Sequence, residues 1–143
     1  MRKAGLIALS AVMLVGCTSI NVRPVDGNRF KLVHVCIQNN PKVIISDFLQ
    51  VLRDGIERHG LSTQVFEGYQ APSACEYIVT YTARQSWDFS PYLSQALIEM
   101  RRGNELVARA EYHLRAKGGL SLAKWAGTES KMNPVIDEML KNL

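Results

Sequence analysis

Two runs of alternating apolar and polar residues, 92–100 and 106–114, lie on either side of Gly103. This alternation is typical of strands that bury one face, and a glycine between two such strands indicates a hairpin. The more apolar faces of the two runs coincide if Met100 lies opposite Leu106, which predicts a three-residue loop centred on Gly103. The hairpin therefore predicts an antiparallel sheet as the main framework of the fold.

A strand, a helix and a second strand are predicted ahead of this hairpin. Residues 30–37 are rich in strand formers. Asn40-Pro41 has the order of an N-cap followed by a first helical residue, and apolar residues recur every three or four positions over 43–59. Gly60 is placed to end that helix in a left-handed conformation. A short strand is expected over 61–67.

The remaining elements complete an α+β pattern. Residues 76–83 alternate and predict a third strand, and Asn133-Pro134 predicts the start of a final helix. Between the hairpin and that helix, 116–127 reads as a loop whose larger apolar side chains turn inward, namely Leu120, Leu122 and Trp125. We expect a single domain over 30–143, a two-layer fold with two helices on a five-stranded, largely antiparallel sheet.

The start of the chain has the layout of a secretory signal segment. Two basic residues follow Met1, and 4–15 is apolar apart from Ser10. A run of this length is too short to cross a hydrocarbon core of about 30 Å, which needs about 20 helical residues. The sequence therefore predicts an exported chain from which residues 1–16 are removed.

Leu14-Val15-Gly16-Cys17, which closes this segment, resembles the lipobox of bacterial lipoproteins. The resemblance implies that Cys17 becomes the N-terminus and is acylated on its sulfur and its amine. Several acyl chains hold a protein on a membrane stably, whereas one chain does so only marginally. Because Thr18 and not aspartate follows the cysteine, the resemblance favours the outer membrane, facing the periplasm. The alternative is an uncleaved core helix with Cys17 buried in it.

Processing changes the composition from which partners are judged. Removal of residues 1–16 takes away Arg2 and Lys3, so the net charge falls from +4 to 15 − 13 = +2 over 143 − 16 = 127 residues. This small charge is spread along the chain and argues against nucleic acid as a partner. Residues 17–29 contain Pro24 and show no sustained period, so they are expected to form a tether between lipid and domain.

Two cysteines, Cys36 and Cys75, remain once Cys17 is assigned to lipid, and a pair in an exported chain indicates a disulfide. A disulfide needs neighbouring Cα atoms, so we expect the first and third strands to be adjacent and antiparallel. With a right-handed crossover between the first two strands, the expected sheet order is two, one, three, four, five. Two buried free thiols are the alternative.

Catalytic, metal and cofactor motifs are scarce in this sequence. No two histidines have the spacing of a helical zinc site, and neither Ser121 nor Ser130 lies in a Gly-x-Ser-x-Gly elbow. Glu111 and His113 share one strand face and are candidates for an acid and base, although a solvated strand face is the explanation that the pattern favours. We therefore assign no catalytic residue, metal or cofactor, and do not expect an enzyme.

A group of aromatic and polar residues falls in the predicted loops, where binding residues concentrate. Its members are Tyr69, Trp87, Asp88, Phe89, Tyr92, Lys124 and Trp125. The alternative is that Trp87, Phe89 and Trp125 cover one end of the core. The runs from Cys75 to Asp88 and from Lys117 to Trp125 resemble those of small uncharacterised proteobacterial lipoproteins, a resemblance that brings no activity with it.

These patterns favour a lipid-anchored binding or assembly module of the cell envelope over an enzyme. Its expected partner is another envelope protein, contacted through a sheet edge or through the aromatic group. Recognition of peptidoglycan or glycan by Trp87 and Trp125 is the second hypothesis. A hydrolase using Glu111 and His113 is the third.

Overall fold

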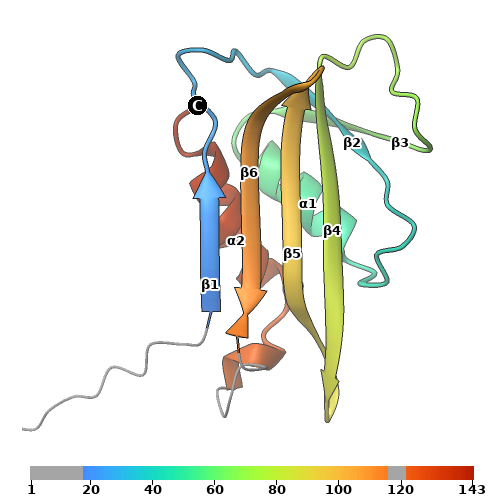
Figure 1. Ribbon diagram of the computed structural model, residues 1–143, viewed down its shortest axis with the longest axis vertical. Helices are drawn as coiled ribbons and strands as arrows, with labels where there is room; N and C mark the ends of the chain where they lie inside the picture. Colours follow the sequence, from blue (N-terminus) through green and yellow to red (C-terminus); the bar gives the residue numbers. More distant parts are fainter. Residues whose placement is uncertain (1–17, 116–121) are drawn as a thin grey trace, which may run out of the picture.

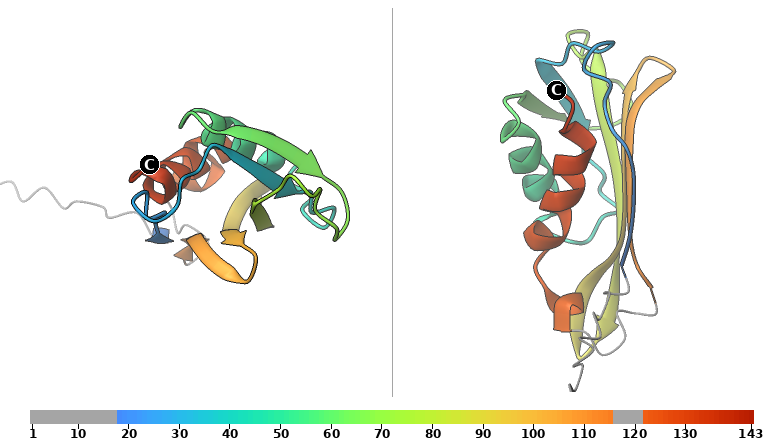
Figure 2. Two further views of the ribbon diagram at one scale, coloured as in Figure 1. Left: turned by 90° about the horizontal axis from the view of Figure 1, so that it is seen from above. Right: turned by 90° about the vertical axis from the view of Figure 1, so that its left-hand side faces the viewer.

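The computed structural model describes residues 18–115 and 122–143. It is an α+β fold of two layers, a six-stranded mixed sheet and two α-helices that cover one of its faces (Figures 1 and 2). In chain order the elements are β1 (Thr18–Arg23), β2 (His34–Gln38), α1 (Phe48–Glu57), β3 (Ser62–Phe66), β4 (Tyr77–Asp88), β5 (Ser90–Arg102), β6 (Glu105–Leu114), the 3-10 helix η2 (Leu122–Trp125) and α2 (Thr128–Leu140). Within the described residues, no helix is both long and apolar enough to span a bilayer. The predicted signal segment and Cys17 lie outside the described residues.

The core lies between the helices and the face of the sheet that they cover. Alternate residues of β4 and β5 point into it, as the sequence predicts, with Val79 and Ile98 fully buried. The ring of Phe48, at the start of α1, stacks on that of Tyr81 with centroids 5.4 Å apart. Ile136 of α2 is also fully buried, so both helices are attached to the sheet through apolar side chains.

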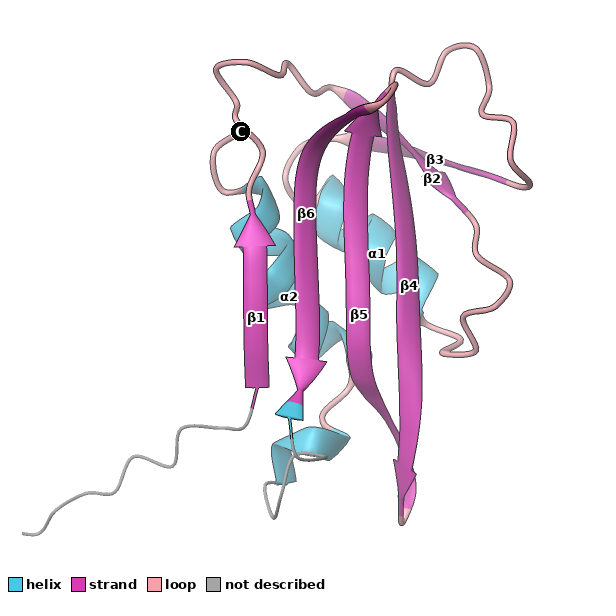
Figure 3. Ribbon diagram, in the orientation of Figure 1, coloured by secondary structure: helices cyan, strands magenta, loops and turns pink. Residues whose placement is uncertain are grey.

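Sheet order confirms which of the five predicted strands are neighbours, but the sheet has a sixth strand. The order is β1-β6-β5-β4-β2-β3, and β1 pairs with β6 from Thr18 opposite Leu114 to Arg23 opposite Arg109 (Figure 3). The predicted tether is therefore wrong for 18–23. The sequence of β1 has only Ile20 and Val22 as alternating apolar residues, of which Val22 is half-buried and Ile20 is exposed, and so short an alternation cannot be distinguished from a loop by periodicity alone. The folded part thus begins directly after Cys17.

The disulfide is present, but the strand direction inferred from it is wrong. Cys36 and Cys75 are bonded with Cα atoms 5.7 Å apart. Yet β2 runs parallel to β4, pairing only at Cys36 opposite Ile78 and Ile37 opposite Val79. Cys75 lies in the loop before β4 and reaches β2 from there. The disulfide therefore requires that this loop lie close to β2, but it does not determine whether β2 and β4 are parallel or antiparallel.

The predicted register of the long hairpin is also wrong. Met100 lies opposite Ala108, and the turn is the two-residue Gly103-Asn104 between Arg102 and Glu105. A β-bulge after Met100 inserts one extra residue on β6, which changes the alternation once and returns the apolar faces to the same side. The apolar faces of β5 and β6 therefore coincide, as predicted, but through a two-residue turn and a bulge and not through a three-residue loop.

Both helices start elsewhere than predicted. The helix α1 begins at Phe48, because the Asn40 side chain caps a turn instead, accepting the Lys42 N–H and donating to the Tyr81 carbonyl. The helix α2 begins at Thr128, five residues before Asn133, and contains Pro134 within it. Gly60 is confirmed as the left-handed residue after α1, with φ of 81°.

Candidate functional site

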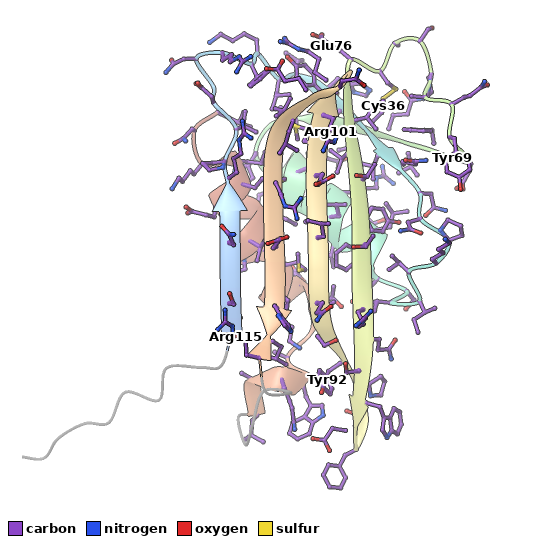
Figure 4. The ribbon with its side chains drawn as sticks, in the orientation of Figure 1. Cys36, Tyr69, Glu76, Tyr92, Arg101 and Arg115 are labelled. Atoms are coloured by element: carbon purple, nitrogen blue, oxygen red, sulfur yellow. A yellow bond between two sulfur atoms is a disulfide. The ribbon has the colours of Figure 1, made fainter. Side chains whose placement is uncertain are left out.

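The predicted aromatic group separates into two places. Tyr69 lies beyond β3 at the side of the molecule, whereas Tyr92 lies near the end where β4 and β5 join (Figure 4). Trp125 joins Tyr92 at that end, because its indole N–H donates to the carbonyl oxygen of Asp88 at 2.8 Å. The two places form two candidate sites, which we call the hairpin tip (87–91) and the side pocket.

The hairpin tip is an exposed apolar turn. Asp88 pairs with Ser90, leaving Phe89 alone at the apex. The side chains of Trp87 and Phe89 are 72% and 90% exposed, so neither covers the core. Phe89 has a φ of 59°, a conformation that is strained for an aromatic residue.

A polar and aromatic base fixes the tip from below. Lys124 of η2 forms a salt bridge with Asp88, is itself nearly buried, and lies 4.4 Å from the centroid of the Trp125 ring. Tyr92 is buried, and the Lys131 ammonium lies 5.6 Å from the centroid of its ring. The expectation that an aromatic covers the end of the core thus holds for Trp125, which packs partly buried against it.

Lys131 ties this base to the final helix. Its ammonium donates to the carbonyl oxygen of Leu93 at 3.0 Å and to that of Lys124. Burial lowers the pKa of Lys131. In the same region Leu122 is 80% exposed, so the prediction that it turns inward is wrong, and Leu120 lies outside the described residues.

The side pocket is a cavity of about 500 Å³ at the carboxyl ends of the parallel strands β2 and β3. It opens on the outer face of the sheet, beside β4 and β5. Its walls combine amides, two carboxylates, one ammonium and two tyrosines: Gln38, Asn39, Asn40, Pro41, Lys42, Glu67, Gly68, Tyr69, Thr80, Tyr81, Thr82, Leu97 and Glu99. Tyr69 is 98% exposed at its rim.

Hydrogen bonds between side chains hold the rim of the side pocket in place. The Tyr81 hydroxyl donates to Asn39 Oδ1 at 3.1 Å and accepts the N–H of Asn40 at 3.2 Å. The Asn39 amide donates to Glu67 at 2.9 Å, which joins the segment after β2 to the segment after β3. Sequence reasoning missed this site because Asn40 was interpreted as a helix cap. A cluster of three amides directly after a strand was the available signal.

Glu111 and His113 lie together on the outer face of the sheet but each has another partner. Arg109 bonds both Glu111 and, at 2.7 Å, Glu99, and the hydrogen bond to Glu111 raises the pKa of Arg109. His113 Nε2 lies 3.1 Å from the Gln95 amide nitrogen. Throughout 18–115 and 122–143, no group of three or more acidic, histidine or cysteine side chains is arranged to hold a metal ion.

Comparison with known proteins identifies the fold alone. No protein-family model matches the chain, and no curated protein matches it. A structure of the PelC dodecamer from Paraburkholderia phytofirmans is similar, with a TM-score of 0.52 and 11% identity over 87% of this chain and 96% of PelC. A point variant of the same dodecamer gives a TM-score of 0.51 and 12% identity, over 82% and 96% of the two chains.

Proposed function

We propose that the protein is a lipid-anchored, non-enzymatic binding module of the cell envelope, with its ligand in the side pocket. The signal segment and the lipobox-like residues ending in Cys17 support the anchor. The observation that supports the binding role is the side pocket itself, a hollow of about 500 Å³, within the size range of ligand sites. Its rim is held by side-chain hydrogen bonds, so little ordering is needed on binding.

A segment of another envelope protein is the ligand that the surrounding fold favours. Strand β3 is an edge of the sheet, so one side of its backbone is open to a further strand. The chain leaves β3 at Phe66 and passes directly into the pocket rim at Glu67 and Tyr69. A peptide strand added to β3 would therefore continue toward the side pocket.

Crosslinking in intact cells tests this proposal. A photoreactive amino acid at Tyr69 is expected to trap the same partner reproducibly, whereas one at Val33 is expected to trap none. Val33 is the matched control because it is also exposed, at 74%, and lies outside the lining of the pocket. Equal products from both positions, or none from Tyr69, would contradict the proposal.

Recognition of a glycan is the second candidate, because an exposed aromatic ring beside amides and carboxylates suits sugar hydroxyls and ring faces. Tyr69 is a better platform for it than Trp125, whose ring has Lys124 against it. Tyr69→Ala is expected to lose binding to purified peptidoglycan, and Tyr69→Phe to keep it. Binding that persists in Tyr69→Ala would remove this candidate.

Self-assembly is the remaining role to measure, given the dodecameric state of the PelC structures. The protein mass of the purified lipidated chain in detergent, after subtraction of bound detergent, distinguishes a single copy from an assembly. A mass of several copies would assign the edge strands β1 and β3 to contacts between copies.

A further inference from the structure

We propose that the hairpin tip, together with Leu122 of η2, enters the lipid surface on which the chain is anchored. This inference rests on the anchor at Cys17 that is part of the proposed function, and it does not depend on the side pocket. The occupant is the headgroup and upper acyl region of a bilayer, and not a protein groove.

The composition of the tip fits that environment. Trp87, Phe89 and Leu122 are three large apolar side chains with most of their surface exposed, and tryptophan in particular concentrates at the boundary between lipid and water. Asp88 is the one charged residue within 87–91, and Lys124 neutralises it through a salt bridge. No unpaired charge of the tip would therefore have to leave water.

The tip lies at the end of the sheet where the anchored end of the chain begins. Thr18 pairs with Leu114, so β1 begins at the same end of the sheet as the tip (Figures 1 and 2). The paired ladder of β5 and β6 reaches only Gln95 opposite His113, and β5 extends beyond it to Ser90. At about 3.3 Å per residue these five residues project the tip up to about 17 Å past the ladder.

The short connection to Cys17 then sets where the lipid surface lies. One extended residue spans about 3.5 Å, so acyl chains on Cys17 hold the start of β1 within a few ångströms of the headgroups. Interfacial segments sit about 5–10 Å deep in the boundary between headgroups and acyl chains. A hairpin that projects beyond the start of β1 reaches that depth even when the strands are tilted.

The backbone conformation of Phe89 also supports insertion of the tip into lipid. A positive φ at a turn apex is the position where glycine is expected, yet the chain has an aromatic residue there that packs little against the rest of the protein, with 90% of it exposed. Packing within the fold does not account for this side chain, whereas contact with lipid does.

Fluorescence of the full, lipidated chain in phospholipid vesicles tests the inference, because the sequence contains two tryptophans. In Trp125→Phe the emission comes from Trp87 alone. We expect it to shift to shorter wavelength in vesicles and to fall about twofold when the lipids carry bromine near the headgroup end of their acyl chains. Emission that brominated lipid leaves unchanged and aqueous iodide quenches fully would overturn the proposal.

A control tryptophan is available away from the tip. A chain with Trp87→Phe, Trp125→Phe and Tyr69→Trp reports on the side pocket, and its emission is expected to respond to iodide and not to brominated lipid. Equal quenching by brominated lipid at positions 69 and 87 would show a protein lying flat on the membrane, and would overturn insertion by the tip. The variant Trp87→Phe, which retains Trp125, reports on the base itself, and thermal unfolding of Trp125→Phe against the wild type shows whether the base stays folded without the hydrogen bond from the indole to Asp88.

The mass of the same sample separates this inference from the proposed anchor. A chain that carries acyl mass on Cys17 but shows no lipid quenching at Trp87 keeps the anchor and loses the insertion. A chain without acyl mass whose Trp87 is quenched keeps the insertion and loses the anchor. A shift of Trp87 emission to shorter wavelength and protection from iodide in a soluble complex with a second copy or another protein, without vesicles, would assign the tip to a protein contact instead.

Discussion

Phe89 combines a strained backbone with an exposed aromatic ring. It holds a left-handed φ of 59° at the apex of the turn between β4 and β5, and such conformations cost an L-residue about 1–2 kcal/mol. Its ring recovers little of that cost by packing, since it is 90% exposed. The fold alone would be served better by glycine.

Phe89→Gly is therefore expected to leave the free energy of unfolding unchanged or to raise it by up to about 1 kcal/mol, because relief of the strain outweighs the larger entropy of an unfolded glycine. Chemical denaturation measures the change. Quenching of Trp87 by brominated lipid should weaken in the same variant. A loss of stability of more than about 1 kcal/mol would show that the ring supports the fold itself.

Residue patterns predicted the buried faces better than the ends of the elements. Val79 and Ile98 are buried as the alternation indicated, because burial follows directly from which side of a strand a residue occupies. Asn40-Pro41 was wrong as a helix start because the asparagine side chain bonds Tyr81, a residue distant in sequence. Local capping patterns carry no information about such a partner.

A group of polar side chains directly after α1 bonds to α2. Asp137 of α2 accepts hydrogen bonds from Arg58 and, at 2.8 Å, from His59. Partial burial alone would raise the pKa of Asp137, but the hydrogen bonds from Arg58 and His59 together hold this pKa below its usual value. The carboxylate is thus bound more strongly in the folded protein than in the unfolded chain.

Because the pKa of Asp137 is lower in the folded state, its contribution is present above the unfolded value near pH 4 and is lost as the pH falls through the folded value. Asp137→Asn is expected to lower the unfolding midpoint at pH 6, with the difference from wild type shrinking below about pH 4. Thermal unfolding from pH 2 to pH 6 measures it. Glu138→Gln is the control, one position further along α2 and paired with Lys141; the same pH profile in both variants would contradict the assignment.

The disulfide between Cys36 and Cys75 ties the loop before β4 to the strand that ends at the side pocket. The two cysteines are 39 positions apart, and closing a loop of that size stabilises the fold by up to about 4 kcal/mol in the chain-entropy description. Replacing both by alanine should lower the free energy of unfolding by about 2–4 kcal/mol. Denaturation with and without reductant measures it, and a variant as stable as the oxidised wild type would contradict the prediction.

For the strands, the sequence predicted which ones are neighbours but not their direction or register. The cysteine pair and the crossover rule predicted the order of five strands, which the structure confirms. The direction of β2 against β4 was missed because only two residue pairs join them, and the hairpin register because a bulge follows Met100. The amides after β2 could be recognised from the sequence, but their position beside β4 depends on the parallel direction of β2 and so could not be predicted.

The whole molecule has its two candidate sites at different places, the hairpin tip at one end and the side pocket away from it (Figure 4). If the tip lies in the membrane, the side pocket faces the aqueous compartment. The arrangement depends on β1 starting directly after Cys17.

Insertion of ten glycine and serine residues between Cys17 and Thr18 tests that dependence. Such a linker has an average span of about 17 Å, so the domain can leave the surface while the acyl chains stay in it. We expect acyl mass on Cys17 to be retained and quenching of Trp87 by brominated lipid to decrease. A linker of ten residues that alters neither measurement would show that the tip holds the surface without help from β1.

The pairing of β1 with β6 also determines how the protein would carry a mechanical load. A partner pulling at the side pocket against lipid at Cys17 would stretch β1 along its own axis, away from the end at which it begins. Hydrogen bonds of an antiparallel ladder lie across the strands, so the six residue pairs between Thr18 and Arg23 would be sheared together and not opened one by one. The strand that leaves almost no slack at the membrane would thus also be the part of the fold best oriented to resist being pulled from it.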